Sequence, residues 1–122
     1  MSTIDLTEKN FEKTLQDHSI VLVDFWAAWC GPCRSFAPTY EKSSDNHPDV
    51  LFGKVDTEAE QALSASAGIS SIPTLMAFRE GILVFSQPGV LPGKDLEKVV
   101  EAVKDLDMDA VRSQLEQQNR QA

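Results

Sequence analysis

Two cysteines separated by two residues, Cys30 and Cys33, are the side chains of this 122-residue chain best suited to chemistry. Three positions apart at the start of a helix, their β-carbons lie roughly 5–6 Å from each other on one face. A disulfide is within reach of that spacing, so the pair can hold either two thiols or one disulfide. The thiolate is the nucleophile of thiol–disulfide exchange, and the spacing therefore indicates redox chemistry.

The residues around the pair favour a thiolate at the first cysteine. Gly31 allows close approach of the backbone, and Pro32 suits a first helical turn, where its missing N–H would have no helical partner. The free N–H groups of the helix end and the positive charge of Arg34 stabilise a negative sulfur. We expect Cys30 to be the attacking thiol and Cys33, one turn further, to be the resolving thiol.

Two other interpretations of the pair stay open from spacing alone. A structural disulfide closing so short a ring stabilises the fold by only about 2 kcal/mol in the chain-entropy treatment. A tetrahedral metal site needs two more ligands, and His18 and His47 both fall at turn positions without ligand spacing. Redox chemistry is the favoured interpretation, and no metal site is predicted.

Asp24 is a lone carboxylate among Val23, Phe25 and Trp26, six residues before the first cysteine. It either reaches water at the end of a strand or is buried. Burial would raise the pKa of its carboxyl group by desolvation and allow proton exchange near neutral pH.

Hydrophobic patterning predicts the elements that position these residues. Residues 20–26 are apolar on both faces of the predicted strand, which is typical of a central strand covered on two sides. Helices and strands then alternate, and a hairpin comes last, so we predict an α/β fold with a central mixed sheet flanked by helices on both faces. The other predicted elements are a helix capped by Thr7 and ending near Asp17, a helix from the cysteines to about Asp45, a strand over 50–55, a helix capped by Asp56 or Thr57 and stopped by Gly68, strands over 74–78 and 82–85, and a helix after Gly93.

The composition excludes several classes of function. Eleven Lys and Arg against 19 Asp and Glu give a net charge of -8, which disfavours nucleic acid and anionic membranes as partners. The N-terminal residues lack the basic and then apolar order of a signal peptide, and residues 20–30 are too short an apolar run to span a bilayer. We expect a cytoplasmic protein, in a compartment where thiols are kept reduced.

The segment from Asp24 to Cys33, DFWAAWCGPC, resembles the active-site segment of thioredoxins. Further motifs follow in the thioredoxin order and spacing, and the resemblance covers roughly residues 3 to 104. These motifs are Ala37-Pro38, Lys54-Val55-Asp56, Gly68-Ile69, Ile72-Pro73-Thr74, Phe78-Arg79-Glu80-Gly81 and Gly89.

The resemblance implies roles for residues outside the cysteine pair. Asp24 would help to deprotonate Cys33, and Lys54 would approach Asp24, although a solvated lysine at a strand end is the alternative. Ile72-Pro73 would form a cis peptide bond beside the cysteines, and residues 71–73 would present backbone groups to an extended substrate. Ser71 belongs to that loop, and an apolar rim is expected from Trp29, Gly31, Pro32, Ile72, Gly89 and Val90.

The resemblance also implies the function. A thioredoxin reduces protein disulfides, binds no cofactor, is re-reduced by thioredoxin reductase with NADPH, and contributes to cell redox homeostasis. We expect a monomer whose partners are this reductase and disulfide-containing proteins. An oxidase or isomerase of the same fold, or a binding module without turnover, are the competing interpretations.

The chain continues beyond the usual end of a thioredoxin. We predict a thioredoxin domain over residues 1–106 and a short helical extension over residues 107–122, capped by Asp107. Its apolar stripe consists of Met108, Val111 and Leu115. The expected arrangement is a partly frayed helix packed loosely on the domain, and a partner-binding tail is the alternative.

Overall fold

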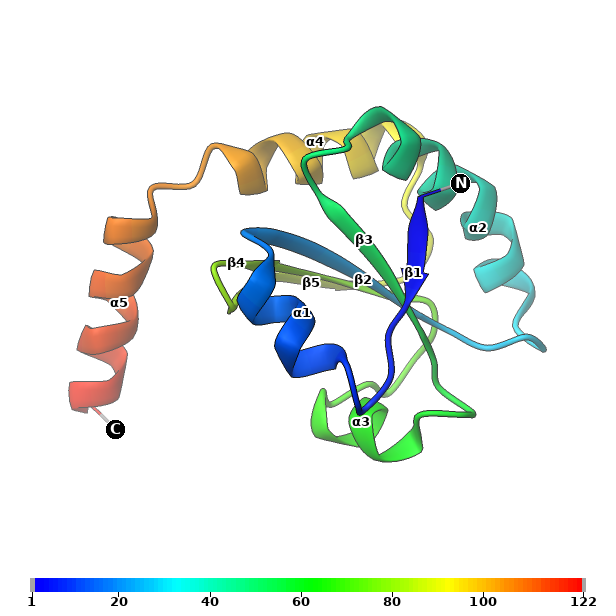
Figure 1. Cartoon of the computed structure of the whole chain (residues 1–122), viewed down its shortest axis with the longest axis horizontal. Coiled ribbons are helices and arrows are strands. Elements are labelled where there is room, and N and C mark those ends of the chain that lie inside the picture. Colours follow the sequence, from blue (N-terminus) through cyan, green and yellow to red (C-terminus); the bar gives the residue numbers. More distant parts are fainter. Residues whose placement is uncertain (1, 122) are drawn as a thin grey trace.

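The computed structural model describes residues 2–121 and contains a five-stranded sheet (Figure 1). The strands lie in the order β1-β3-β2-β4-β5, with β1–β3 and β3–β2 parallel and β2–β4 and β4–β5 antiparallel. A mixed sheet was the expectation, and it is confirmed. In chain order the elements are β1 (Thr3–Asp5), α1 (Phe11–Asp17), β2 (Ile20–Trp26), α2 (Gly31–Asn46), β3 (Leu51–Asp56), α3 (Gln61–Ser66), β4 (Thr74–Arg79), β5 (Ile82–Pro88), α4 (Gly93–Lys104) and α5 (Met108–Gln121).

Helices cover both faces of the sheet, as predicted (Figure 1). On one face α2 and α4 pack with Phe36, Tyr40, Leu96 and Val100 fully buried against the central strands. On the other face α1 and α3 cover a second cluster that includes Phe11. Strand β2 contributes buried side chains to both clusters, which explains its nearly uninterrupted apolar sequence.

Strand β1 was not predicted. Its three residues are half-exposed or exposed, so the sequence carries no apolar signal there. The strand exists because it pairs with β3, with Thr3 opposite Phe52, and because the following residue, Leu6, is buried.

Two helices begin later than the sequence indicated. Thr7 Oγ1 accepts the N–H of Lys9, and Asp56 Oδ1 accepts those of Glu58 and Ala59, so each caps a turn that precedes the helix. Asp107 caps α5 as predicted, because its carboxylate accepts the N–H groups of residues 109 and 110.

Helix α5 follows α4 and stands apart from the sheet (Figure 1). Met108 is buried, but Leu115 is 36% exposed. Arg112 joins the helix to the turn between β4 and β5 through a 2.6 Å ion pair with Glu80. The division into a domain over 1–106 and an extension over 107–122 stays a prediction.

Candidate functional site

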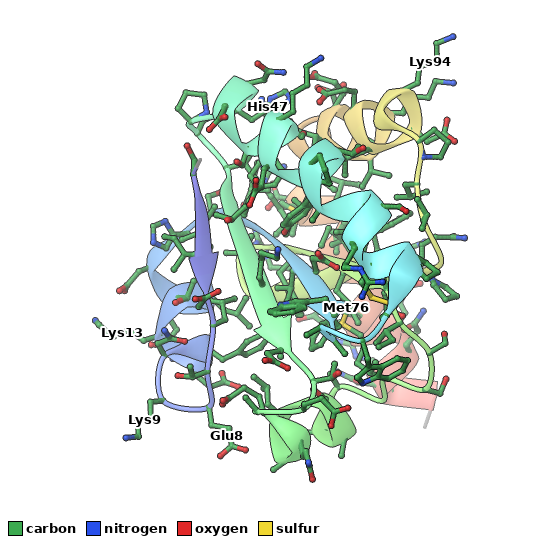
Figure 2. All side chains as sticks on the ribbon, turned by 90° about the vertical axis from the view of Figure 1, so that its right-hand side faces the viewer. Glu8, Lys9, Lys13, His47, Met76 and Lys94 are labelled. Carbon is green, nitrogen blue, oxygen red and sulfur yellow. A yellow bond between two sulfur atoms is a disulfide. The ribbon has the colours of Figure 1, made fainter. Side chains whose placement is uncertain are left out.

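The cysteine pair lies at the N-terminal end of α2, just after the loop that connects it to β2. Cys30 is the N-cap of the helix and Cys33 lies in its first turn. The two form a disulfide with their Cα atoms 5.3 Å apart, visible as the yellow bond at the N-terminal end of α2 (Figure 2). Both side chains are buried, at 4% and 3% exposure. The predicted ability of this spacing to hold a disulfide is confirmed.

The helix end is arranged to stabilise negative charge on the first sulfur. The backbone N–H of Cys33 donates to Cys30 Sγ over 3.2 Å. The Arg34 guanidinium donates to the carbonyl of Ala28 over 2.7 Å, which holds its charge over the loop that precedes the helix. A backbone N–H and a helix N-terminus placed in this way stabilise negative charge on a sulfur.

Asp24 lies in β2 and is buried, at 1% exposure. Neither carboxylate oxygen has a hydrogen-bond partner within the described part of the chain. Burial raises the pKa of Asp24 from 3.8 to about 7, and the positive charge of Lys54 opposes that rise. Of the two interpretations of this residue, the buried acid is therefore correct.

Lys54 is the register partner of Asp24 across strands β2 and β3. Its ammonium group lies 5.2 Å from the ring centroid of Trp26, a cation–π distance. The Trp26 indole N–H is buried and has no partner among residues 2–121. Lysine, indole and carboxylate thus form a sparsely hydrogen-bonded group, of which Trp26 packs against the cluster that contains both cysteines.

The loop before β4 lies against the cysteines, and Ile72-Pro73 is a cis peptide bond, as predicted. The Ile72 carbonyl oxygen lies 3.9 Å from Cys30 Sγ. The Pro73 carbonyl accepts the N–H of Gly89 over 2.8 Å, and Thr74 Oγ1 donates to the Ser71 carbonyl. Gly89 has φ +95°, a conformation that favours glycine.

A groove of about 650 Å³ opens beside the disulfide. Trp29 forms part of its wall and is 68% exposed, and its indole donates to Glu58 Oε1 over 2.6 Å. Six predicted site residues line the groove, namely Trp29, Cys30, Gly31, Pro32, Ser71 and Ile72. The sequence analysis missed the other six, which are Thr57, Gln61, Ser64, Ala65, Ile69 and Ser70.

Gly89 and Val90 do not line this groove. Gly89 contacts the cis-proline loop through the hydrogen bond to Pro73, and Val90 beside it is 45% exposed. The predicted apolar rim is therefore divided, with its 29–32 and 71–72 portions in the groove and its 89–90 portion on the neighbouring turn.

The described residues contain no cluster of three His, Cys, Asp or Glu side chains that could hold a metal ion. His47 instead bridges α2 and α4, with Nε2 2.6 Å from Glu97 and Nδ1 3.0 Å from the Lys104 ammonium. Figure 2 shows it at the far end of α2 from the disulfide. Within the same part of the chain, no helix is long and apolar enough to cross a membrane.

Comparison with known proteins agrees with this geometry. The chain matches the thioredoxin family model over residues 2–102. It is 53% identical over 121 residues to "Putative thioredoxin 2" of Streptomyces coelicolor, covering 99% of this chain and 90% of that protein. It is 42% identical over 97 residues to a thioredoxin of Alicyclobacillus acidocaldarius, covering 79% and 92%.

The fold agrees as well. A solved structure of a mutant thioredoxin from Halobacterium salinarum superposes with a TM-score of 0.81 at 28% identity, covering 87% of this chain and 94% of that one. The Cys30–Cys33 pair performs dithiol–disulfide exchange, which is the activity of a protein-disulfide oxidoreductase. This chain belongs to the thioredoxin family.

Proposed function

We propose that the protein works as a protein-disulfide reductase in which Cys30 attacks and Cys33 resolves. The observation that carries this order is the hydrogen bond from the Cys33 N–H to Cys30 Sγ, which favours a thiolate at Cys30. Cys30 also lines the groove, so a substrate disulfide lying there meets this sulfur.

The exchange takes two steps. The Cys30 thiolate attacks one sulfur of a substrate disulfide, forms a mixed disulfide and releases the other substrate sulfur as a thiolate. Cys33 then loses its proton and attacks the sulfur of Cys30, which breaks the mixed disulfide and releases the second substrate sulfur. The protein ends as the Cys30–Cys33 disulfide, and its two electrons remain on the substrate thiols.

Asp24 is the proposed acceptor of the Cys33 proton. With a pKa of about 7, its carboxyl group exchanges protons at the pH at which the reaction runs. Lys54 modulates it, because the positive charge of the lysine lowers the pKa of Asp24 while burial raises it. This gives the unpaired carboxylate a role that fold stability does not explain.

Substrate recognition is proposed to rest on shape and backbone contacts. Residues Ser71, Ile72 and Pro73 form a loop beside the sulfurs, and Pro73 has no N–H to compete for them. An extended segment would lie along this loop as a short added strand. Supporting contacts come from Trp29, Gly31, Pro32, Gly89 and Val90.

The remaining parts of the proposal follow the family. Thioredoxin reductase with NADPH re-reduces the disulfide, disulfide-containing proteins are the substrates, and the protein contributes to redox homeostasis in the cytoplasm as a monomer without a bound cofactor. Residues 1–106 form the redox domain and residues 107–122 a helical extension. A measured reduction potential separates this reductase from an oxidase or isomerase, whose potentials are less negative.

Removal of the resolving thiol tests the two-step scheme. Cys33→Ser is expected to accumulate mixed disulfides when incubated without added thiols with a protein that contains an accessible disulfide, because nothing then releases Cys30. Intact-mass measurement before and after reduction detects the adduct. The matched control Cys30→Ser should form none, and a Cys33→Ser variant that formed no adduct would contradict the scheme.

A further inference from the structure

A second ionisable side chain is buried on the same side of the sheet as Asp24. Tyr40 of α2 is 0% exposed and belongs to the cluster that also contains Leu22 of β2. Side chains of a strand alternate between its two faces, and Val23 and Phe25 belong to the cluster on the opposite face. Asp24 follows Leu22 by two residues, so its side chain lies on the face that Tyr40 covers.

The Tyr40 hydroxyl is anchored to the strand that pairs with Asp24. It donates to the Gly53 carbonyl over 2.8 Å. Gly53 immediately precedes Lys54, the register partner of Asp24 across β2 and β3. The ring packs edge to face on Phe52, with the two centroids 5.2 Å apart. The hydroxyl is thus held on β3 one residue before the position opposite Asp24.

The hydroxyl and the carboxyl group also interact electrostatically. Burial raises the pKa of Tyr40 well above its usual range, the negative charge of Asp24 raises it further, and the Asp24 backbone N–H opposes the rise by hydrogen bonding. Tyr40 is therefore a neutral hydroxyl near neutral pH. Electrostatic interactions act in both directions, so the dipole of this hydroxyl acts in turn on the Asp24 carboxyl group.

Few other groups act on Asp24. Among the described residues, neither of its carboxylate oxygens has a hydrogen-bond partner, and the charged group that affects its pKa is Lys54. Its register partner on β4 is the apolar Leu75. Helix α4 adds only apolar side chains to the cluster that contains Tyr40, namely Leu96, Val100 and Val103. The ionisation of Asp24 therefore depends on nearby dipoles, and the Tyr40 hydroxyl supplies one.

Packing alone does not require this hydroxyl. A phenylalanine would keep the ring contact with Phe52. A hydroxyl buried in an apolar cluster destabilises the fold unless it is hydrogen-bonded, and its bond to Gly53 only offsets that loss. A tyrosine at this position thus adds a polar group to the core without a clear gain in stability.

We propose that Tyr40 is a positioning residue of the redox reaction: its hydroxyl stabilises the carboxylate form of Asp24 and so sets the pH range in which Asp24 takes the proton of Cys33. The inference rests on the proposed function, in which Asp24 accepts that proton. The O–H group can turn about the C–O bond, so its dipole orients toward a charged carboxylate, which a phenyl ring cannot do. Without the hydroxyl, Asp24 should be harder to ionise.

Tyr40→Phe tests the proposal, because it removes the hydroxyl and keeps the ring. NMR of isotope-labelled aspartate carboxyl groups follows the ionisation of Asp24, whose signal is the one absent from Asp24→Ala. In Tyr40→Phe the midpoint of this titration should move to higher pH by about 0.5–1 pH unit, the equivalent of one polar interaction. The pH dependence of substrate release from the mixed disulfide, measured by rapid mixing, should move by the same amount.

The matched control is Ser43→Ala. Ser43 is another buried residue of α2, and its hydroxyl donates to Glu97 over 2.9 Å. Removal of this hydroxyl should change neither the titration of Asp24 nor the pH dependence of substrate release. The control therefore separates the position of the Tyr40 hydroxyl from the general effect of losing a hydrogen bond in α2.

A second measurement leaves the packing intact. Tyr40 is the only tyrosine of the chain, so incorporation of a ring-fluorinated tyrosine labels this position alone. The fluorine NMR signal of the folded protein should change with pH at the same midpoint as the Asp24 carboxyl group. This inflection should be absent from Asp24→Ala.

The inference is overturned if the Asp24 titration in Tyr40→Phe is unchanged or moves to lower pH, if Ser43→Ala moves it equally, or if the fluorine signal shows no inflection shared with Asp24. Failure of the proposed function has a different signature. In that case the Asp24 titration would still move in Tyr40→Phe, but the pH dependence of substrate release would be the same in the wild type, Tyr40→Phe and Asp24→Ala.

Discussion

Asp24 shows how one residue links stability to chemistry. Its pKa of about 7 in the folded protein, against 3.8 when free of the fold, means that the folded state holds a proton that the unfolded state releases between these values. The contribution of Asp24 to the free energy of unfolding therefore falls as pH rises from about 4 to 7 and levels off above. The difference between these two pKa values corresponds to a loss of roughly 4 kcal/mol.

Replacement of this carboxyl group should reverse that loss. Asp24→Ala is expected to gain stability relative to the wild type as pH rises, with the difference growing by roughly 4 kcal/mol between about pH 4 and pH 8. Denaturant titrations at several pH values measure it, and Asp105→Ala, an exposed carboxylate, is the control. Parallel stability curves for Asp24→Ala and the wild type would contradict the raised pKa.

The same variant separates the two thiols in kinetics. Asp24→Ala should slow the release of substrate from the mixed disulfide, because Cys33 then lacks its proposed proton acceptor. Alkylation of Cys30 should stay close to the wild-type rate, since its thiolate is stabilised by the N–H of Cys33. An unchanged pH dependence of the resolving step would remove Asp24 from the mechanism.

At the residue scale, the sequence predicts those site residues that a local pattern identifies. It does not predict the residues that reach the site only through tertiary packing. The cysteine spacing and a carboxylate in an apolar strand are visible in the sequence. Ser64 is not, because a serine in a short helix usually faces water, and nothing near it in the chain places it beside a disulfide 31 residues away.

At the element scale, β1 depends on a contact that the sequence does not display. Leu6 follows the strand and packs over Gly53 of β3, where a β-carbon would come within 2.8 Å of Leu6 Cγ. A glycine in a strand interior usually weakens it, but here the missing side chain makes room for a neighbour. The position of the short strand β1 beside β3 thus depends on the absence of a side chain at Gly53.

Filling this space should destabilise the protein. Gly53→Ala is expected to lower the free energy of unfolding by about 1–3 kcal/mol, the usual effect of overpacking a core. In a Leu6→Ala background, the same substitution should have little effect, because the colliding side chain is absent. Equal effects in both backgrounds, measured by denaturant unfolding, would show that the two residues do not collide.

The ends of elements also show what the sequence could not decide. The strand over 82–85 continues to Pro88, because Leu75 and Thr74 pair with Gln87 and Pro88 across the hairpin. Ser86, Gln87 and Pro88 are residue types that, without their neighbours in the fold, indicate a turn. The neighbouring strand supplies the pairing that extends β5, and that information is not local.

At the scale of the whole molecule, α5 differs from the other helices in how it is held. Met108 is buried at its start, and among the described residues the Arg112–Glu80 pair is the only ion pair that joins α5 to the β4–β5 hairpin. Exposed ion pairs contribute little to stability. The redox site, in contrast, is built entirely from residues before position 74 and from the turn at 89–90.

Deletion of residues 107–122 should therefore leave a protein that unfolds cooperatively and reduces disulfides at the wild-type rate. The expected loss of stability is roughly 1.5–3 kcal/mol, the effect of exposing one buried methionine site. Thermal unfolding and turnover of a small disulfide measure both quantities. Loss of cooperative unfolding would show that the extension is an integral part of the domain, and Arg112→Ala isolates the contribution of the ion pair.

The hydrogen bond from the Cys33 N–H to Cys30 comes from the main chain, and this has a consequence for mutational tolerance. Any replacement of Cys33 except proline leaves that amide in place, so the proposed nucleophile should keep this hydrogen bond even in variants that have lost the second thiol. Neighbouring side chains can then vary with the range of substrates without removing this main-chain contribution to the reactivity of the sulfur.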